Sequence, residues 1–303
     1  MRIAITGANG HLGNRLLQAL KSEHEVIAIV RSPRAKKDLE LKNLQIPISV
    51  VDYTDTNSLR SALEGVDSVV HLVGIIKAFT DSTYEDAHEN ACSALIEALL
   101  AESNENNEVQ KLKKIIYLSI VGSHPDSDNA CLASKGRGEE ILLSKAHSSY
   151  ISSTILQVPM VLGEGDFASY ALGKNARSHF AFTFRSGSLE QPIYAGDVIQ
   201  TILKVLQSSD TPERIKLAGP ESLSRKKLIA RAAEVLGTSP MVISLPVALG
   251  MCLAFIFEFL PRPPVTRSML GVLDHDDNLQ VSEICRQLGI ELTSLNEMLK
   301  KVL

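Results

Sequence analysis

The chain has 303 residues, of which 45% are hydrophobic and 22% charged, with a net charge of −4 and a pI near 6.1. This length allows one large domain or a domain with an added lobe, and the acidic balance argues against a nucleic-acid-binding protein. The four cysteines are far apart and form no CxxC pair, so we predict neither a metal site nor a disulfide framework. Because a strand is expected to begin at Arg2, we expect no signal peptide and a cytoplasmic protein.

A glycine-spaced turn follows the first apolar run. Residues 3–6 favour a buried strand, and leucines at helical spacing begin at residue 12. Gly7 permits a tight turn, Gly10 lets the backbone approach a pyrophosphate, and Gly13 allows the helix to lie close to the sheet. The amino end of that helix would add free N–H groups and a positive dipole end. The turn therefore predicts a dinucleotide site, to which we assign Thr6, Gly7, Asn9, Gly10, His11, Leu12 and Gly13.

Apolar runs then alternate with helical patterns. Further strands are expected at residues 26–30, 48–51, 68–74 (with the exit turn), 114–119 and 154–159. This alternation predicts an α/β fold with a Rossmann-type doubly wound parallel sheet. We assign residues 1–162 to the NAD(P)-binding domain and most of residues 163–303 to a smaller C-terminal substrate or interaction lobe. Segments near 192–218 are expected to return to the sheet, in particular 193–194 and 215–217.

The end of the second strand indicates which dinucleotide is preferred. NAD-binding folds hold the ribose 2′-OH with an acidic residue at this point, but this chain has Arg31, followed by Ser32 and Arg34. A guanidinium can bind a 2′-phosphate that a carboxylate would repel. We therefore predict NADP(H) as the preferred cofactor, with NAD(H) as the alternative. Arg31 could instead stack on adenine or lie in solvent.

Other strand ends supply further candidates, because ligands of such sheets gather at the carboxyl ends of the strands. We assign to the cofactor site the residues Asp52, Tyr53, Leu72, Val73, Gly74 and Pro159. Gly74 would let the backbone run close to the cofactor. His71 lies inside an apolar strand and is interpreted as a packed core histidine rather than a base.

One stretch of the C-terminal half is almost wholly apolar. Residues 245–260 carry only Glu258 as a charged residue and are too short to span a bilayer comfortably. We interpret them as a helix packed within the lobe. The alternatives are an interfacial helix or one wall of an apolar substrate pocket, and residues 245–264 are a candidate contact for a membrane or a protein partner. The oligomeric state is left open.

The pattern Thr6-Gly7-x-x-Gly10-x-x-Gly13 resembles the TGxxGxxG motif of extended and atypical short-chain dehydrogenases/reductases. Softer similarities at 157–163, 192–197, 217–221 and 260–267 resemble the subgroup that contains the nucleotide-binding accessory subunit of respiratory complex I, often labelled NAD-dependent epimerase/dehydratase or NmrA-like. Position by position, this resemblance implies Ser119 as the carbonyl-polarising serine, Lys135 as the lysine that binds the nicotinamide ribose, and Asn90 as the asparagine that holds a water relay. Ser134, Lys135 and Glu139 resemble the Ser-Lys-x-x-x-Glu continuation of atypical members.

The chain departs from the family at the tyrosine position, which is Cys131. A thiol is a better acid than a phenol but is shorter. Next to a protonated Lys135 it could become a redox-active thiolate, or it could be an inert small residue. His124 on the preceding loop is a substitute proton donor in this interpretation.

Three functional hypotheses follow. The first is an NADP(H)-dependent oxidoreductase acting on a small carbonyl or quinone, with Ser119, Lys135, Cys131 and Asn90 as its catalytic candidates. The second is a non-catalytic NADP(H)-binding sensor or accessory protein, which Cys131 favours. The third and weakest is a sugar-nucleotide epimerase, because the only candidate arginines for a diphosphate are Arg177 and Arg185.

Overall fold

The computed structural model describes residues 1–79, 81–105, 113–146, 151–260, 263–272 and 275–303. These divide into two compact units. The first comprises residues 1–157 and 202–215, and the second comprises residues 158–201 and 216–303.

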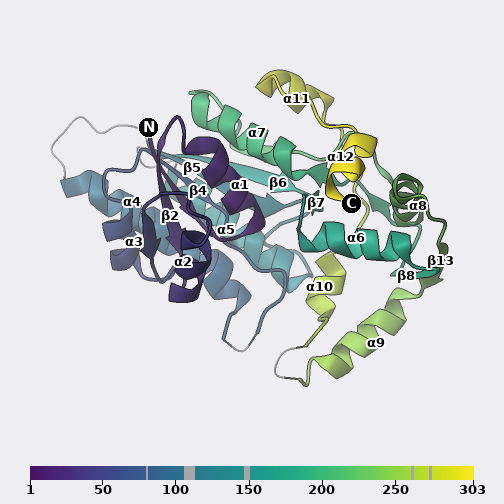
Figure 1. Ribbon diagram of the computed structural model, residues 1–303. Coiled ribbons are helices and arrows are strands. Elements are labelled where there is room, and N and C mark those ends of the chain that lie inside the picture. Colours follow the sequence, from purple (N-terminus) through teal and green to yellow (C-terminus); the bar gives the residue numbers. More distant parts are fainter. Residues whose placement is uncertain (80, 106–112, 147–150, 261–262, 273–274) are drawn as a thin grey trace. The chain divides into compact units, whose positions relative to one another are not determined.

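The first unit is built on a parallel sheet, which confirms the predicted fold class. Among the described residues, seven strands pair in the order β11-β6-β5-β4-β1-β2-β3 (Figure 1). Their bounds are β1 (Arg2–Thr6), β2 (Glu25–Val30), β3 (Ile48–Val50), β4 (Ser68–His71), β5 (Lys113–Ile120), β6 (Ile151–Val158) and β11 (Arg214–Lys216). β1 lies between β2 and β4, with Thr6 level with both Ile29 and His71. Because β1, β2 and β4 are parallel, their carboxyl ends lie at the same edge of the sheet.

Helices connect these strands. They are α1 (His11–Leu20), α2 (Pro33–Glu40), α3 (Thr56–Ala62), the π-helix η1 (Glu85–Asn90), α4 (Ala91–Glu105) and α5 (Ala130–Ala146). One core joins apolar residues of α3, α4 and α5 to those of the strands, while α1 and α2 pack on β1, β2 and β3. The N-cap of α3 is Asp55, whose side chain accepts a hydrogen bond from the Asn57 N–H.

The second unit contains shorter strands and several helices. The strands are β7 (Val161–Leu162), β8 (Phe180–Phe184), β9 (Leu189–Glu190), β10 (Ile193–Tyr194), β12 (Leu223–Ser224) and β13 (Met241–Leu245). The helices are α6 (Phe167–Arg177), α8 (Arg225–Leu236), α9 (Val247–Phe257), α10 (Arg267–Val272), α11 (Ser282–Leu288) and α12 (Leu295–Val302), and α7 (Ala195–Gln207) contributes residues to both units. Of the two segments expected to rejoin the large sheet, 215–217 does so through residues 215–216, which belong to β11. β10 does not, because it pairs with β7 in a two-stranded sheet.

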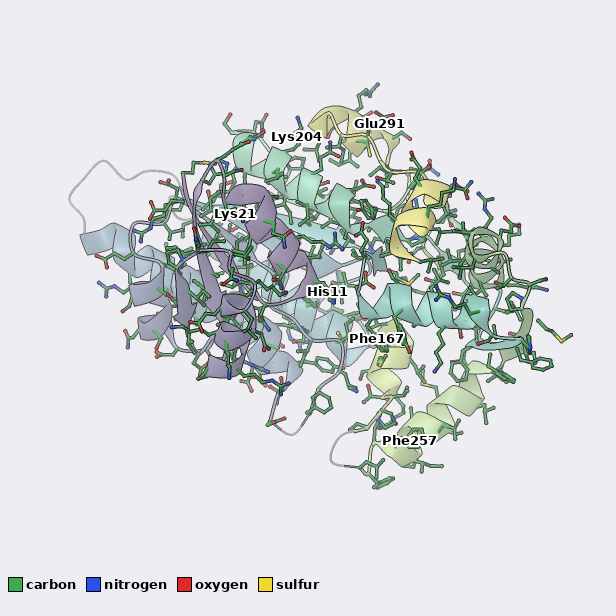
Figure 2. The ribbon with its side chains drawn as sticks, in the orientation of Figure 1. His11, Lys21, Phe167, Lys204, Phe257 and Glu291 are labelled. Carbon is green, nitrogen blue, oxygen red and sulfur yellow. The ribbon has the colours of Figure 1, made fainter. Side chains whose placement is uncertain are left out.

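The apolar stretch at 245–260 has an exposed surface. It forms the end of β13 and then α9, in which only Gly250 and Ala254 are buried. Its exposed large side chains are Leu249, Leu253, Phe255, Ile256, Phe259 and Leu260. Phe257, the last residue of α9, is labelled in Figure 2. In the described part of the chain, no helix combines the length and apolar character needed to cross a bilayer. Residues 261–262 lie outside the described residues. Binding of a membrane or a protein partner through residues 245–264 stays a prediction.

Candidate functional site

The turn between β1 and α1 depends on two of its glycines. Gly7 has a φ of +69°, a backbone conformation that favours glycine. A Cβ atom at Gly13 would lie 2.6 Å from the carbonyl oxygen of Gly7 and 2.7 Å from that of Ala8. No larger residue at position 13 could keep α1 this close to the strand. The sequence prediction for this local geometry is confirmed.

Side chains outside the turn keep it in place. The Tyr53 hydroxyl accepts a hydrogen bond from the Gly7 N–H and donates one to the Ile29 carbonyl, both at 2.8 Å. Burial raises the pKa of Tyr53 to about 12, so the phenol keeps its proton. Asn14 Nδ2 donates to the carbonyls of Asn9 and Gly10. Tyr53, which we assigned to the cofactor, therefore supports the turn with a hydroxyl that already has two partners.

The amino end of α1 is open to a ligand. Its N-cap is Gly10, and no side chain caps the helix. Asn9, Gly10 and His11 are exposed, and His11 marks this end of α1 in Figure 2. An anion here would meet N–H groups and the positive end of the helix dipole. A cradle that excludes Cβ atoms and presents backbone donors fits a dinucleotide diphosphate.

The ends of β2 and β3 carry polar side chains that already have partners. An Arg31 guanidinium nitrogen donates to Ser82 Oγ at 3.3 Å, and both Arg31 and Arg34 are exposed. Ser32 caps α2 by accepting from the Ala35 N–H. Asp52 is exposed and accepts from both the N–H and the hydroxyl of Thr54. Arg31 and Arg34 therefore place accessible positive charge after β2.

The Lys135 side chain packs against residues 73–74, which form the turn after β4. Its ammonium donates to the Leu118 carbonyl at 2.9 Å and lies 4.4 Å from the centre of the Tyr117 ring. A Cβ atom at Gly74 would come within 2.7 Å of Lys135 Nζ. Burial lowers the pKa of Lys135 to about 8. This amine can therefore exchange its proton near neutral pH.

Cys131 is not the thiolate that the neighbouring lysine suggested. The side chain is fully buried, and Sγ donates to the Ile75 carbonyl at 3.4 Å. Burial raises the pKa of the thiol to about 11, and this effect outweighs the opposing charge of Lys135. Of the two alternatives raised for this residue, the redox-active thiolate is therefore wrong for this conformation.

Ser119 is held by a buried carboxylate. Its hydroxyl donates to Glu139 Oε1 at 2.5 Å, and Gln157 Nε2 donates to both Glu139 oxygens at 2.9 and 3.0 Å. Burial raises the pKa of Glu139, while these hydrogen bonds and Arg214 oppose the rise. While Glu139 is ionised, Ser119 has no second proton with which to polarise a carbonyl.

Asn90 does not lie among these residues. It is exposed, and its Nδ2 donates to Asp86 Oδ1 at 2.9 Å. The π-helix turns the opposite face inward, so that His88, two residues earlier, is fully buried and accepts from the Ile75 N–H at 3.1 Å. No hydrogen bond among the described residues joins Asn90 to Ser119, Lys135 or Cys131, and its role in a water relay stays a prediction. Sequence reasoning missed His88, because no motif distinguishes it from a surface histidine.

The remaining candidates have ordinary surroundings. His71 is buried, and its Nδ1 lies 2.7 Å from Thr6 Oγ1, as expected for a core histidine. His124 is exposed beside Asp126. In the second unit, Arg177 donates to the Leu303 carbonyl and Arg185 to Asp276. Leu12 is the second residue of α1, and Pro159 directly follows β6.

A cavity in the first unit lies elsewhere. Its volume is about 220 Å³, and it is lined mainly by apolar residues of α1, α2, β2, the segment before β3 and the start of β3, including Leu17, Leu39 and Ile48. None of the catalytic candidates lines it. We base the site on the strand ends and not on this cavity.

Comparisons with known proteins agree with this geometry. Residues 7–162 match the model of a family described as NAD(P)H-binding. The chain is 24% identical over 255 residues to a ceramide reductase of Caulobacter vibrioides, covering 80% of this chain and 73% of the relative. It is 22% identical over 230 residues to the mitochondrial NADH-ubiquinone oxidoreductase 40 kDa subunit of Neurospora crassa, covering 74% of this chain and 57% of that subunit, which is less than two thirds of its length.

A solved structure shares the fold. The UDP-glucuronic acid 4-epimerase of Bacillus cereus in complex with NAD matches with a TM-score of 0.74 and 19% identity. The match covers 100% of this chain and 97% of the epimerase. At this identity the similarity concerns the fold alone.

Proposed function

The chain belongs to the NAD(P)H-binding family, and we propose that it binds NADP(H) at the β1–α1 turn and acts as an oxidoreductase on a small carbonyl or quinone. The resemblance to atypical short-chain dehydrogenases/reductases is confirmed by the family match and by the relatives. The single observation that carries the proposal is the amino end of α1, which no side chain caps and which lies close to the strand because Gly13 packs on the Gly7 carbonyl.

The preference for the 2′-phosphate rests on Arg31 and Arg34. Both side chains are exposed directly after β2. Asp52, the carboxylate after β3, is engaged by Thr54. Guanidinium groups at this strand end would bind a 2′-phosphate and gain less from a free 2′-hydroxyl.

The same change of charge, made once at Arg31 and once at a lysine far from the proposed 2′-phosphate site, tests this preference. Arg31→Glu should weaken NADPH binding about tenfold or more, the loss of one charge-assisted contact, and should leave NADH binding within about twofold. Lys21→Glu is the control, because Lys21 follows the opposite end of α1 (Figure 2). Fluorescence titration of both cofactors measures the constants. Equal affinities of the wild type for NADPH and NADH would reject the role of Arg31.

Reduction is the reaction class that the remaining groups and the relatives support. A bound nicotinamide would supply the hydride, and the acceptor oxygen would need a proton. Lys135 is the group whose pKa, about 8, suits proton donation near neutral pH. The names of two relatives, a reductase and a subunit of an NADH-ubiquinone oxidoreductase, support a carbonyl or quinone substrate.

A second candidate is a non-catalytic NADP(H)-binding sensor or accessory protein. It is favoured by Cys131, which is protonated and buried, and by Ser119, whose hydroxyl proton is donated to Glu139. A screen of carbonyls and quinones, with NADPH oxidation as the readout, separates the two candidates. Turnover that Lys135→Met abolishes supports the reductase, whereas tight NADPH binding without oxidation across the screen supports the binding protein.

A further inference from the structure

The turn that leaves β4 lies directly against the glycine turn. A Cβ atom at Gly7 would lie 3.1 Å from the carbonyl carbon of Leu72 and 3.3 Å from the amide nitrogen of Val73. Backbone this close leaves little room for a side chain at position 7, so the two turns pack directly on each other. Residues 72–75 would therefore form the adjoining wall of the proposed dinucleotide site.

Three buried side chains from η1 and α5 hold this wall. Lys135 Nζ donates to the Val73 carbonyl at 3.4 Å. His88 Nε2 accepts from the Ile75 N–H at 3.1 Å, and Cys131 Sγ donates to the Ile75 carbonyl at 3.4 Å. The exposed fractions of Lys135, His88 and Cys131 are 5%, 0% and 0%. Both polar backbone groups of Ile75 are thus held by side chains from other elements.

We propose that His88 and Cys131 are positioning residues that hold Ile75 from both sides and fix residues 72–75 in the shape that the dinucleotide requires. This inference rests on the proposed function. It also gives the residue in the tyrosine position a role other than proton transfer: the shorter side chain reaches the backbone of the wall instead of a substrate.

The protonation of both side chains suits these contacts. A neutral histidine that accepts at Nε2 carries its proton on Nδ1, and His88 Nδ1 is buried with no partner among the described residues. Burial lowers the pKa of His88 to about 2, so Nε2 remains an acceptor at neutral pH. Burial raises the pKa of Cys131 to about 11, so Sγ retains the proton that it donates. An imidazolium or a thiolate could not make these bonds.

Close packing of α5 against η1 places the two side chains. A Cβ atom at Gly138 would lie 3.1 Å from the His88 carbonyl oxygen. Ser134 Oγ donates to the Tyr84 carbonyl at 3.0 Å. The small residue and the hydroxyl therefore let one turn of α5 approach the start of η1, which brings His88 and Cys131 to the same peptide unit.

The test uses the full chain and two measurements. Hydrogen exchange of the amides at 72–76 is followed without cofactor, and NADPH binding is followed by fluorescence. His88→Leu removes the acceptor and Cys131→Ala removes the donor. Each should speed exchange about tenfold and weaken NADPH binding about tenfold, the change equivalent to ~1.4 kcal/mol. Cys131→Ala provides the same test if His88→Leu does not fold.

Conservative variants and a control separate positioning from general stability. His88→Gln keeps an acceptor and Cys131→Ser keeps a donor, so both should stay within about threefold of the wild type in each measurement. Cys92→Ala is the control, since Cys92 is equally buried on α4. Among the described residues, no hydrogen bond joins it to residues 72–75. It should leave both readouts unchanged.

The outcomes are distinguishable. Unchanged exchange in both His88→Leu and Cys131→Ala would overturn the inference, as would faster exchange with unchanged NADPH affinity. Failure of the wild type to bind NADPH would reject the proposed function, and the exchange rates would then still decide whether His88 and Cys131 hold the wall.

Discussion

The side chains of Cys131 and Lys135 show how burial acts on neighbouring groups of opposite chemistry. The thiol keeps its proton because burial raises its pKa to about 11, and the ammonium loses its proton more easily because burial lowers its pKa to about 8. Both groups move toward their neutral forms. Proximity to Lys135 in the sequence suggested that the thiol could become a thiolate, but desolvation is the larger effect on each group.

Lys135 should therefore make stability depend on pH. Its pKa falls from 10.5 in the unfolded chain to about 8 in the folded protein, so between these values the unfolded chain binds more protons and stability rises with pH. Relative to Lys135→Met, the wild type should gain about 1 kcal/mol between pH 7 and pH 9. Urea denaturation at three pH values measures the difference.

The comparison of the wild type with Lys135→Met is limited to the range from pH 7 to pH 9. Above pH 9 the raised pKa values of Cys92 and Cys131 act in the opposite direction, because the folded thiols then hold protons that the unfolded ones release. Lys21→Met controls for the loss of a positive charge. A constant difference between the wild type and Lys135→Met from pH 7 to pH 9 would contradict the buried ammonium.

At the scale of elements, Gly13 determines how closely α1 approaches β1. An alanine normally stabilises a helix interior by about 1 kcal/mol relative to glycine. Here its Cβ would lie 2.6 Å from the Gly7 carbonyl oxygen. We expect Gly13→Ala to destabilise the protein by about 1–3 kcal/mol, as overpacking does, and to weaken NADPH binding at least tenfold.

The control for this substitution is Gly187→Ala. A Cβ atom there would meet no atom within 4 Å, so both stability and binding should stay near the wild-type values. Thermal denaturation and cofactor titration of the two variants give the comparison. Wild-type stability in Gly13→Ala would show that α1 can move away from the turn without loss.

The sequence was sufficient to predict the strand ends but not the directions of the side chains that follow them. Glycine spacing and apolar alternation are local properties, and they located the β1–α1 turn and Gly74. The partner of Ser119 could not be predicted, because Glu139 reaches it from α5, 20 residues away. The inward direction of His88 depends on the π-helix, which changes the register relative to an α-helix.

At the scale of the whole molecule, the candidate cofactor residues are concentrated in one unit. Apart from Pro159, all of them belong to residues 1–157. They follow β1, β2, β3 and β4 at one edge of the sheet or, like Lys135, lie on α5. A ligand bound there would stabilise only the folded form of this unit, by RT ln(1 + [L]/Kd), which is about 2.7 kcal/mol at a ligand concentration of 100 Kd.

Cofactor binding should therefore leave a defined pattern of protection along the chain. With NADPH at about 100 Kd, hydrogen exchange should slow at residues 7–13, 31, 32, 34 and 72–75, because their N–H groups would face the ligand or border it. Residues 63–67, which precede β4 at the opposite edge of the same sheet, are the internal control and should exchange at the rate of the cofactor-free protein. Arg31→Glu, measured at the same NADPH concentration, should reduce the protection in proportion to its lost affinity. Protection confined to other segments would place the dinucleotide elsewhere and remove the basis for the roles of Gly7, Gly13 and Lys135.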